Sequence, residues 1–122
     1  MTSHRFIQTN LSSVINIIWE DLASDVEGDG FTLAAHSDKT VHIFGDFDGA
    51  SVAIEGSNDP LAETDPDNAD WQTLLDPLGN ALSISSNDIV QLLENTLHVR
   101  PVVVGGSAST AVNVSIVGKK VR

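Results

Sequence analysis

Carboxylates that lie close together in the sequence are the residues whose types and spacing could do chemistry. Asp46 and Asp48 flank a phenylalanine in the run GDFDG. A second cluster comprises Glu63, Asp65, Asp67 and Asp70. Hard cations such as Ca²⁺ take several oxygen ligands, but a loop of the EF-hand type also needs a central glycine and a distal glutamate. Because DFDGAS supplies only two acids before an apolar run begins, we predict no metal site and no cofactor.

The same acids have a structural interpretation. Asp48-Gly49 suits a tight hairpin, because Asp and Gly tolerate the positive φ that such turns require. The acidic stretch 57–70 is either a solvated loop, held open by charge repulsion, or a loop that faces a partner or an ion. The sequence favours the solvated loop and leaves the second interpretation open.

Histidine chemistry has little support. His4, His36, His42 and His98 are scattered along the chain, and no H-E-x-x-H, G-x-S-x-G or phosphate-loop motif is present. A glycosidase pair among the carboxylates depends on a separation that sequence does not supply. We therefore expect no catalytic residue and a protein that is not an enzyme, with His42 and His98 facing solvent from alternating strands.

The two tryptophans allow two interpretations. Trp19 and Trp71 could each stack on a sugar ring, but each belongs to an apolar run, IIWEDL or DWQTLL. Large aromatic side chains mostly serve the core. Aromatic residues make up only 5% of the chain, which argues against an aromatic platform for glycans. Core packing is the prediction for both.

The elements that must position these residues are short strands. Polar turn residues separate apolar runs throughout the chain, as is typical of an antiparallel sandwich or barrel. The strands are expected at 5–8, 14–19, 30–35, 40–44, 51–56, 71–75, 81–84, 97–104 and 112–117. Val52 and Ile54 should share one face of a strand, as should Val112 and Val114. The predicted fold class is an all-β antiparallel sandwich with at most one short helix, near 86–94, after a cap-like serine and asparagine.

Arg100 and Pro101 lie inside the predicted strand 97–104. Proline donates no ladder hydrogen bond, so this strand is expected at a sheet edge or a bulge. Arg100 is the first cation after eleven acidic residues and no lysine or arginine between Thr40 and Val99. We therefore expect Arg100 to be a structural ion-pair partner for this acidic middle.

Charge excludes some partners. The formal net charge is −11, although residues 100–122 carry four cations and no acid. Nucleic-acid binding relies on Lys and Arg to neutralise phosphates, so DNA and RNA are not expected partners. No stretch approaches the roughly 20 apolar residues of a membrane span, and the start lacks the pattern of a secretory signal. We expect no membrane contact and synthesis without export, and the basic C-terminal region could instead dock on an acidic protein surface.

Length and composition indicate one domain over 1–122, with 1–12 as a possible N-terminal arm. Without cysteine, there is neither a disulfide nor a thiolate site. A chain of 122 residues buries a limited share of its surface, so oligomerisation would add stability.

Two resemblances concern residues 41–120. VAIEGSNDP followed by WQTL resembles discoidin-like, galactose-binding sandwiches. The fuller order GDFDGASVAIEGSND, WQTLLDPLGNAL, LHVRPVVVGG and a closing alternating strand is similar to the capsid decoration, or cement, proteins of tailed bacteriophages, with jelly-roll-like domains.

The second resemblance implies a structural virion protein. Such a protein, made in the host cytoplasm, would bind the outer surface of the capsid as a homo-oligomer, with a trimer favoured, and would stabilise the shell by bridging subunits of the major capsid protein. The expected capsid or protomer contacts are Arg5, Phe6, Ile7, Arg100, Lys119, Lys120 and Arg122. The alternative is a carbohydrate- or ion-binding sandwich module of a phage tail or adhesive assembly.

Overall fold

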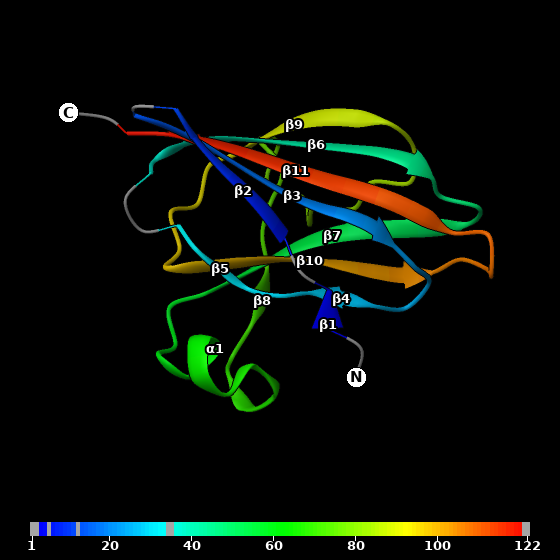
Figure 1. Ribbon diagram of the computed structural model, residues 1–122, viewed down its shortest axis with the longest axis horizontal. Helices are drawn as coiled ribbons and strands as arrows, with labels where there is room; N and C mark the ends of the chain where they lie inside the picture. Colours follow the sequence, from blue (N-terminus) through cyan, green and yellow to red (C-terminus); the bar gives the residue numbers. More distant parts are fainter. Residues whose placement is uncertain (1–2, 5, 12, 34–35, 121–122) are drawn as a thin grey trace.

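The computed structural model describes residues 3–4, 6–11, 13–33 and 36–120, whose strands form two layers packed face to face (Figure 1). The strands are β1 (Ser3–His4), β2 (Phe6–Leu11), β3 (Val14–Leu22), β4 (Glu27–Gly28), β5 (Phe31–Thr32), β6 (Asp38–Asp46), β7 (Ala50–Ser57), β8 (Gln72–Thr73), β9 (Asp88–Leu92), β10 (His98–Gly105) and β11 (Ala111–Lys119). A helical turn, α1 (Leu61–Thr64), and a 3₁₀ turn, η1 (Pro66–Asn68), lie between β7 and β8.

The two sheets have nested strand pairs. Sheet A has the order β1-β4-β10-β7-β8, with β5 also paired to β10, and sheet B has the order β2-β3-β11-β6-β9. The β1–β4 pair is parallel, and the other pairs are antiparallel. Early strands pair with late ones: β3 with β11, β4 with β10, β6 with β9 and β7 with β8. Because this nesting is that of a jelly roll, the predicted all-β sandwich is confirmed.

The core follows the period-2 pattern of the strands. In β11, buried Val112, Val114 and Ile116 alternate with half-buried neighbours, and Val52 and Ile54 do the same in β7. Alternate side chains of a strand point to opposite faces, so each run of this kind lines one inner face of the sandwich.

The Asp-Gly hairpin is confirmed. Asp48 and Gly49 have φ of +44° and +88°, and the Ala50 N–H donates to the Phe47 carbonyl at 2.9 Å. Two successive positive φ values are those of a type I′ turn, whose twist matches that of the flanking strands.

The helix predicted near 86–94 is wrong, because this segment contains β9. Ile89 is exposed whereas Leu92 is buried, and residues 88–92 pair with β6 over their whole length. A helix of about six residues cannot compete with a complete strand ladder. The short helix lies instead at α1, and no helix among the described residues is long enough and apolar enough to cross a membrane.

Pro101 does not mark an edge strand. β10 lies inside sheet A, between β7 on one side and β4 and β5 on the other. The Val103 N–H donates toward β4, to the Val26 carbonyl, so the ring nitrogen of Pro101 faces the same side, at the break between β4 and β5. Proline has no N–H to donate, and at this break no strand pairs with β10. Pro101 therefore costs the sheet no ladder hydrogen bond.

Candidate functional site

Arg100 is the centre of a charged cluster on the outer face of sheet A. Its Nη1 lies 2.8 Å from Glu27 Oε2, and its Nε and Nη2 each lie 2.9 Å from Glu55 Oε1. Glu55 is its cross-strand partner on β7, and Glu27 comes from β4 on the other side. The guanidinium carbon also lies 4.1 Å from the centre of the Trp71 ring. The side chain is only 11% exposed, and the structural ion pair expected with the acidic middle is confirmed by Glu55.

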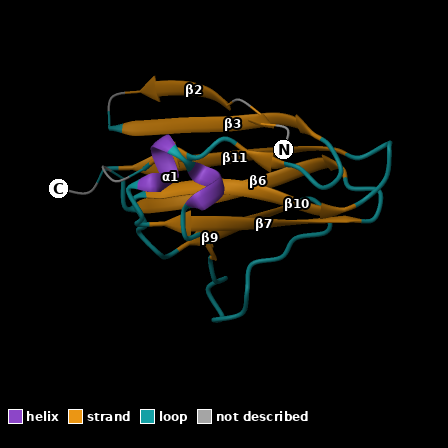
Figure 2. Ribbon diagram, turned by 90° about the horizontal axis from the view of Figure 1, so that it is seen from below, coloured by secondary structure: helices purple, strands orange, loops and turns teal. Residues whose placement is uncertain are grey.

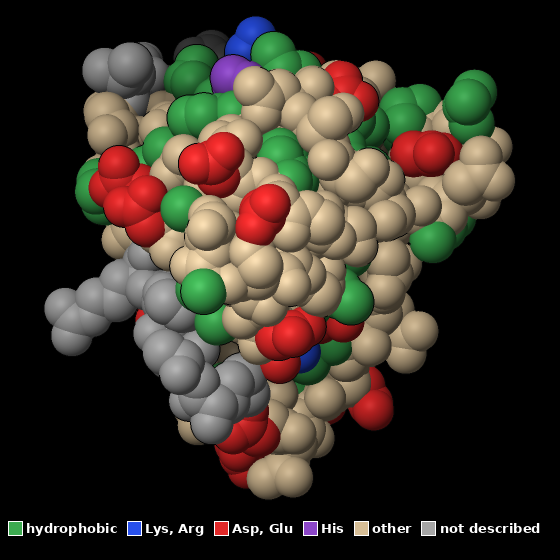
Figure 3. Space-filling view, turned by 90° about the vertical axis from the view of Figure 1, so that its right-hand side faces the viewer, with side chains coloured by type: hydrophobic (Ala, Val, Ile, Leu, Met, Phe, Trp, Pro, Cys, Tyr) green, Lys and Arg blue, Asp and Glu red, His purple; other side chains and the backbone are tan. Residues whose placement is uncertain are grey.

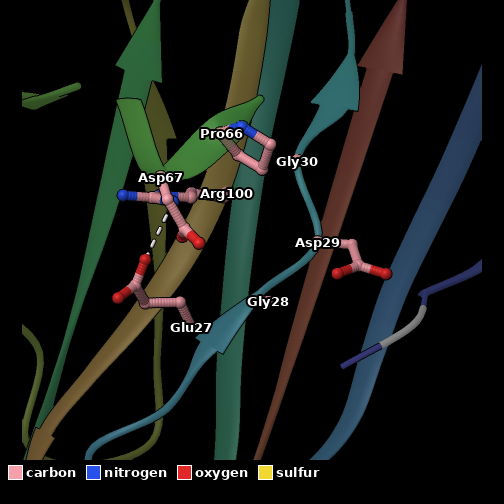
Figure 4. Close-up of a pocket in the computed structure, with 7 residues that line it drawn as sticks. All are labelled: Glu27, Gly28, Asp29, Gly30, Pro66, Asp67 and Arg100. Atoms are coloured by element: carbon pink, nitrogen blue, oxygen red, sulfur yellow. Dashed lines mark ion pairs between the residues drawn. The ribbon is translucent and has the colours of Figure 1, made fainter. Parts of the chain in front are cut away.

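A small pocket opens beside this cluster, at the break between β4 and β5. Its volume is about 140 Å³, below the roughly 300–1,000 Å³ of most ligand pockets. In Figure 4, the Glu27 carboxylate points toward Arg100 and Asp67 lies beside them, whereas Asp29 points away. The lining residues are Glu27, Gly28, Asp29, Gly30, Pro66, Asp67 and Arg100.

Trp71 contacts Pro66 and Arg100, which line this pocket, and it lies outside the core, so its predicted core role is wrong. The ring is half-buried, its Nε1 donates to the Pro66 carbonyl at 3.0 Å, and Arg100 lies over its face. A Cβ on Gly30 would lie 3.0 Å from Trp71 Cη2, so glycine allows the ring to approach. Trp19, by contrast, is fully buried and confirms its prediction, with its Nε1 donating to the Asp29 carbonyl at 2.9 Å.

The acidic stretch 57–70 is a folded strap, because local hydrogen bonds hold it in place. The Asp59 carboxylate accepts from the backbone N–H groups of Leu61, at 3.0 Å, and Asp70, at 3.1 Å. Ser57 Oγ donates to the Asp70 carbonyl at 2.6 Å and accepts from the Asp59 N–H. These bonds close both ends of the strap against β7, so the interpretation of a loop held open by repulsion is wrong.

Asp59 makes the strap sensitive to acid. The two backbone hydrogen bonds hold the pKa of this carboxyl below its ordinary value of 3.8, because they favour the ionised form. Their contribution to stability is therefore fully present above pH 3.8 and is lost as pH falls through the lower pKa of the folded state.

We therefore expect Asp59→Asn to open the strap at neutral pH. The amide protons of Leu61 and Asp70 should exchange faster with solvent in this variant, as measured by NMR hydrogen exchange. The control is Asp67→Asn, an exposed acid of the same segment, which should leave both amides protected. Equal exchange in Asp59→Asn and wild type would contradict the role given to Asp59.

The two ends of the sandwich differ in charge. Exposed Lys119 and Lys120 lie at the end where β3 and β6 begin, here called the basic end, and the Lys120 N–H donates to the Ser13 carbonyl. Burial, followed by the nearby charges of Lys120 and Lys39, holds the pKa of His36 below its ordinary 6.5. The opposite, acidic end is seen in Figure 3, where acidic side chains form several separate groups. The exposed acids of its turns are Asp21, Asp25, Asp46 and Asp48.

Lys39 is a buried cation that the sequence reasoning missed. It is 2% exposed, and its Nζ contacts Asn95 Oδ1. Burial holds the pKa of Lys39 below its ordinary value, against the opposing effect of the Glu94 and Asp38 charges. The buried Oε1 of Glu94 accepts no hydrogen bond. Val41 and Ile43 are core residues of β6, so the same alternation extended by one step would have placed Lys39 inside.

The predicted contact residues fall in three places. Ile7 is 55% exposed on the outer face of sheet B, and Lys119 and Lys120 are exposed at the basic end. Phe6 is half-buried, with its ring 5.9 Å from Trp19. Arg100 lies on the opposite sheet. Arg5 and Arg122 lie outside the described residues, and residues 6–11 of the suggested arm form edge strand β2.

The two strand histidines His42 and His98 differ in their exposure. His42 is exposed as predicted, but His98 is 3% exposed and bonded through Nδ1 to Thr32 Oγ1 at 3.0 Å, so its predicted exposure is wrong. Among the residues that the structure describes, no group of three or more His, Asp or Glu could hold a metal ion.

Comparison with known proteins places the chain in a structural class. No protein-family model matches it, and no curated sequence matches it. Its β-sandwich fold is similar to that of a solved structure. The SPBc2 prophage-derived protein YomS superposes with a TM-score of 0.59 and 14% identity, over 90% of this chain and 97% of that chain. NMB1881 from Neisseria meningitidis superposes less well, with a TM-score of 0.46 and 10% identity, over 94% of this chain and 83% of that chain.

Proposed function

We propose that this chain is a structural protein of a bacteriophage particle that binds the outside of the capsid through its basic end. The charge difference between the two ends carries this proposal. In a protein of net charge −11, the exposed cations Lys119 and Lys120 outnumber the exposed acid Asp38 at one end, whereas the other end carries exposed acids alone among its described charges. Such a charge distribution orients a molecule as it approaches an acidic surface.

The fold and the comparisons support a phage protein of this kind. YomS, a prophage-derived protein, shares the sandwich along nearly its whole length. Jelly rolls are a common architecture of viral capsid domains. The partner would be the major capsid protein, and the site of action the outer surface of the virion.

The physical mechanism is linkage between binding and assembly. A protein that binds only the assembled shell shifts the equilibrium toward that shell, by an amount set by its concentration and affinity. One copy that touches two neighbouring capsid subunits bridges them, and many copies repeat the effect over the particle.

Binding to undecorated capsids of the encoding phage tests the proposal. We expect Lys119→Gln/Lys120→Gln to bind about tenfold more weakly in co-sedimentation, since two exposed ion pairs of up to about 1 kcal/mol each are lost. The control is Ala108→Glu/Ser109→Glu, which changes the net charge by the same amount at the acidic end and should bind like wild type.

Three results would overturn the proposal. They are wild-type protein that does not co-sediment, equal weakening by both double variants, and affinity that does not fall as salt is raised. The alternative carbohydrate- or ion-binding module has its own signature, which is a melting temperature that rises with a sugar or falls with a chelator. Arg100 already lies over one face of the Trp71 ring, so we expect no change with a sugar. No group of three or more His, Asp or Glu among the described residues could hold a metal ion, so we expect no change with a chelator.

A further inference from the structure

The outer face of sheet B is a broad surface with little charge. Strand pairing places Ile7, Ile18, Ser115, His42 and Ile89 in one outward row that crosses all five strands. The next row holds Thr9, Asn16, Val117, Thr40 and Gln91. We call these two rows, with Val14, Lys119, Asp38, Phe44 and Asn113 at their ends, the sheet-B face.

Charge distinguishes this face from the rest of an acidic molecule. Its described residues include one carboxylate, Asp38, and one ammonium group, Lys119, which are Cα partners at the basic end. Exposed Glu20 lies at the border toward the acidic end. Two copies of a chain of net charge −11 repel one another, so they associate most easily through a face that carries no net charge.

The size of the face suffices for a specific interface. Three strands of seven residues on this face, with β2 of six and β9 of five, give a flat area of about 500 Å² per copy at about 4.8 Å between strands and about 3.3 Å per residue. Two copies then bury about 1,000 Å² of accessible surface, which reaches the roughly 1,000 Å² expected of a specific interface. Face-to-face packing of sheets is itself a common arrangement.

Two exposed isoleucines of the face are placed so that two copies can bring them together. Ile7, 55% exposed, and Ile89, 62% exposed, lie in the same row on the two opposite edge strands. Figure 2 shows β2 and β9 far apart across the layer. A two-fold axis along central strand β11 would bring Ile7 of each copy against Ile89 of the other. A shallow hollow of about 410 Å³, bordered by Thr40, Gln91 and Val117, leaves room on the same face for side chains of a second copy.

We infer that the sheet-B face binds a second copy of this chain, which forms a two-fold dimer with the two B sheets packed together. This inference is tested separately from capsid binding, because Lys120 lies outside the sheet-B face and Lys119 lies only at its end. It differs from the trimer implied by the resemblance to decoration proteins, because a flat face that meets itself produces pairs.

Sedimentation velocity on matched threonine variants tests this inference. Thr40 and Thr73 are both exposed strand residues, but Thr40 lies in the sheet-B face and Thr73 lies on β8 of sheet A. Thr40→Arg places a lone guanidinium in the interface and should weaken dimerisation at least tenfold, whereas Thr73→Arg should leave it unchanged. Gln91→Arg, on another strand of the same face, should act like Thr40→Arg if that variant folds poorly.

The results separate this inference from the proposed function. Wild-type protein that sediments as a monomer at 100 µM or as a trimer would overturn it, as would a Thr40→Arg variant that folds and still dimerises. Raised salt should leave the dimer intact, whereas it should weaken capsid binding, because only the second depends on exposed charges. A dimer that does not bind capsids would therefore refute the proposed function alone.

Discussion

Trp19→Ala should lower the free energy of unfolding by about 3–5 kcal/mol, the range found for large aromatic side chains removed from a core. Trp19 is fully buried, makes an edge contact with the Phe6 ring, and donates its Nε1 hydrogen to the Asp29 carbonyl. Gly28 presses against the same indole, since a Cβ there would lie 2.6 Å from Trp19 Cδ1. Because the free energy of unfolding of typical domains is about 5–15 kcal/mol, this loss removes a large share of the stability of the folded state.

Urea unfolding followed by far-ultraviolet circular dichroism measures this loss without depending on tryptophan fluorescence. The comparison is Trp71→Ala, which removes the same side chain from a half-buried position outside the core. Its cost should be about 1–2 kcal/mol, mostly from the lost contact with the Arg100 guanidinium. Equal losses in the two variants would show that the distinction drawn between the tryptophans is wrong.

Arg100→Met should cost about 2–4 kcal/mol. The change keeps the aliphatic part of the side chain and removes the cation between Glu27 and Glu55, which leaves two carboxylates without their counter-ion. Breaking a fully buried pair costs about 3–5 kcal/mol, and the glutamates are 30% and 22% exposed, so water reduces the penalty. Arg100→Lys should recover little, because one ammonium group cannot reproduce the paired geometry of guanidinium.

Neutralising the glutamates separates charge from packing. In Arg100→Met/Glu27→Gln/Glu55→Gln both carboxylates that were paired with Arg100 are neutral, and we expect the stability to return to within about 1 kcal/mol of wild type. If Arg100→Met alone leaves the unfolding midpoint in urea unchanged, Arg100 is free for a partner contact and the structural role assigned to the cluster is wrong.

Much of the fold follows from patterns within a few residues. Val52 and Ile54 alternate with polar neighbours, and Asp48-Gly49 accepts two positive φ values, so the strands and this turn could be predicted. The segment 86–94 could not, because a short apolar run fits a strand or a helix and its pairing with β6 decides the outcome. The nested strand order was implied by resemblance and could not be read from local periodicity.

The charged cluster was harder to predict, since its members meet only in space. Arg100 and Glu55 could be connected by charge, but Glu27 reaches Arg100 through the β4–β10 pairing, far away in the sequence. Asp59 appears in the sequence as one acid among several, and only the direction of two backbone N–H groups shows that it holds the strap. Composition also misled at His98 and Lys39, which are buried although their residue types favour the surface.

The nesting of strands also sets when this chain can fold. β3 begins at Val14, yet its partner β11 ends at Lys119, so sheet B cannot close until β11 has left the ribosome. Pairings between such distant segments form slowly, because the entropy of closing a long loop is lost before any contact forms. During synthesis the apolar face of β3 therefore stays exposed for longer than it would if β3 paired only with a neighbouring strand in a hairpin. A chaperone that holds the nascent chain until β11 emerges would prevent wrong pairings.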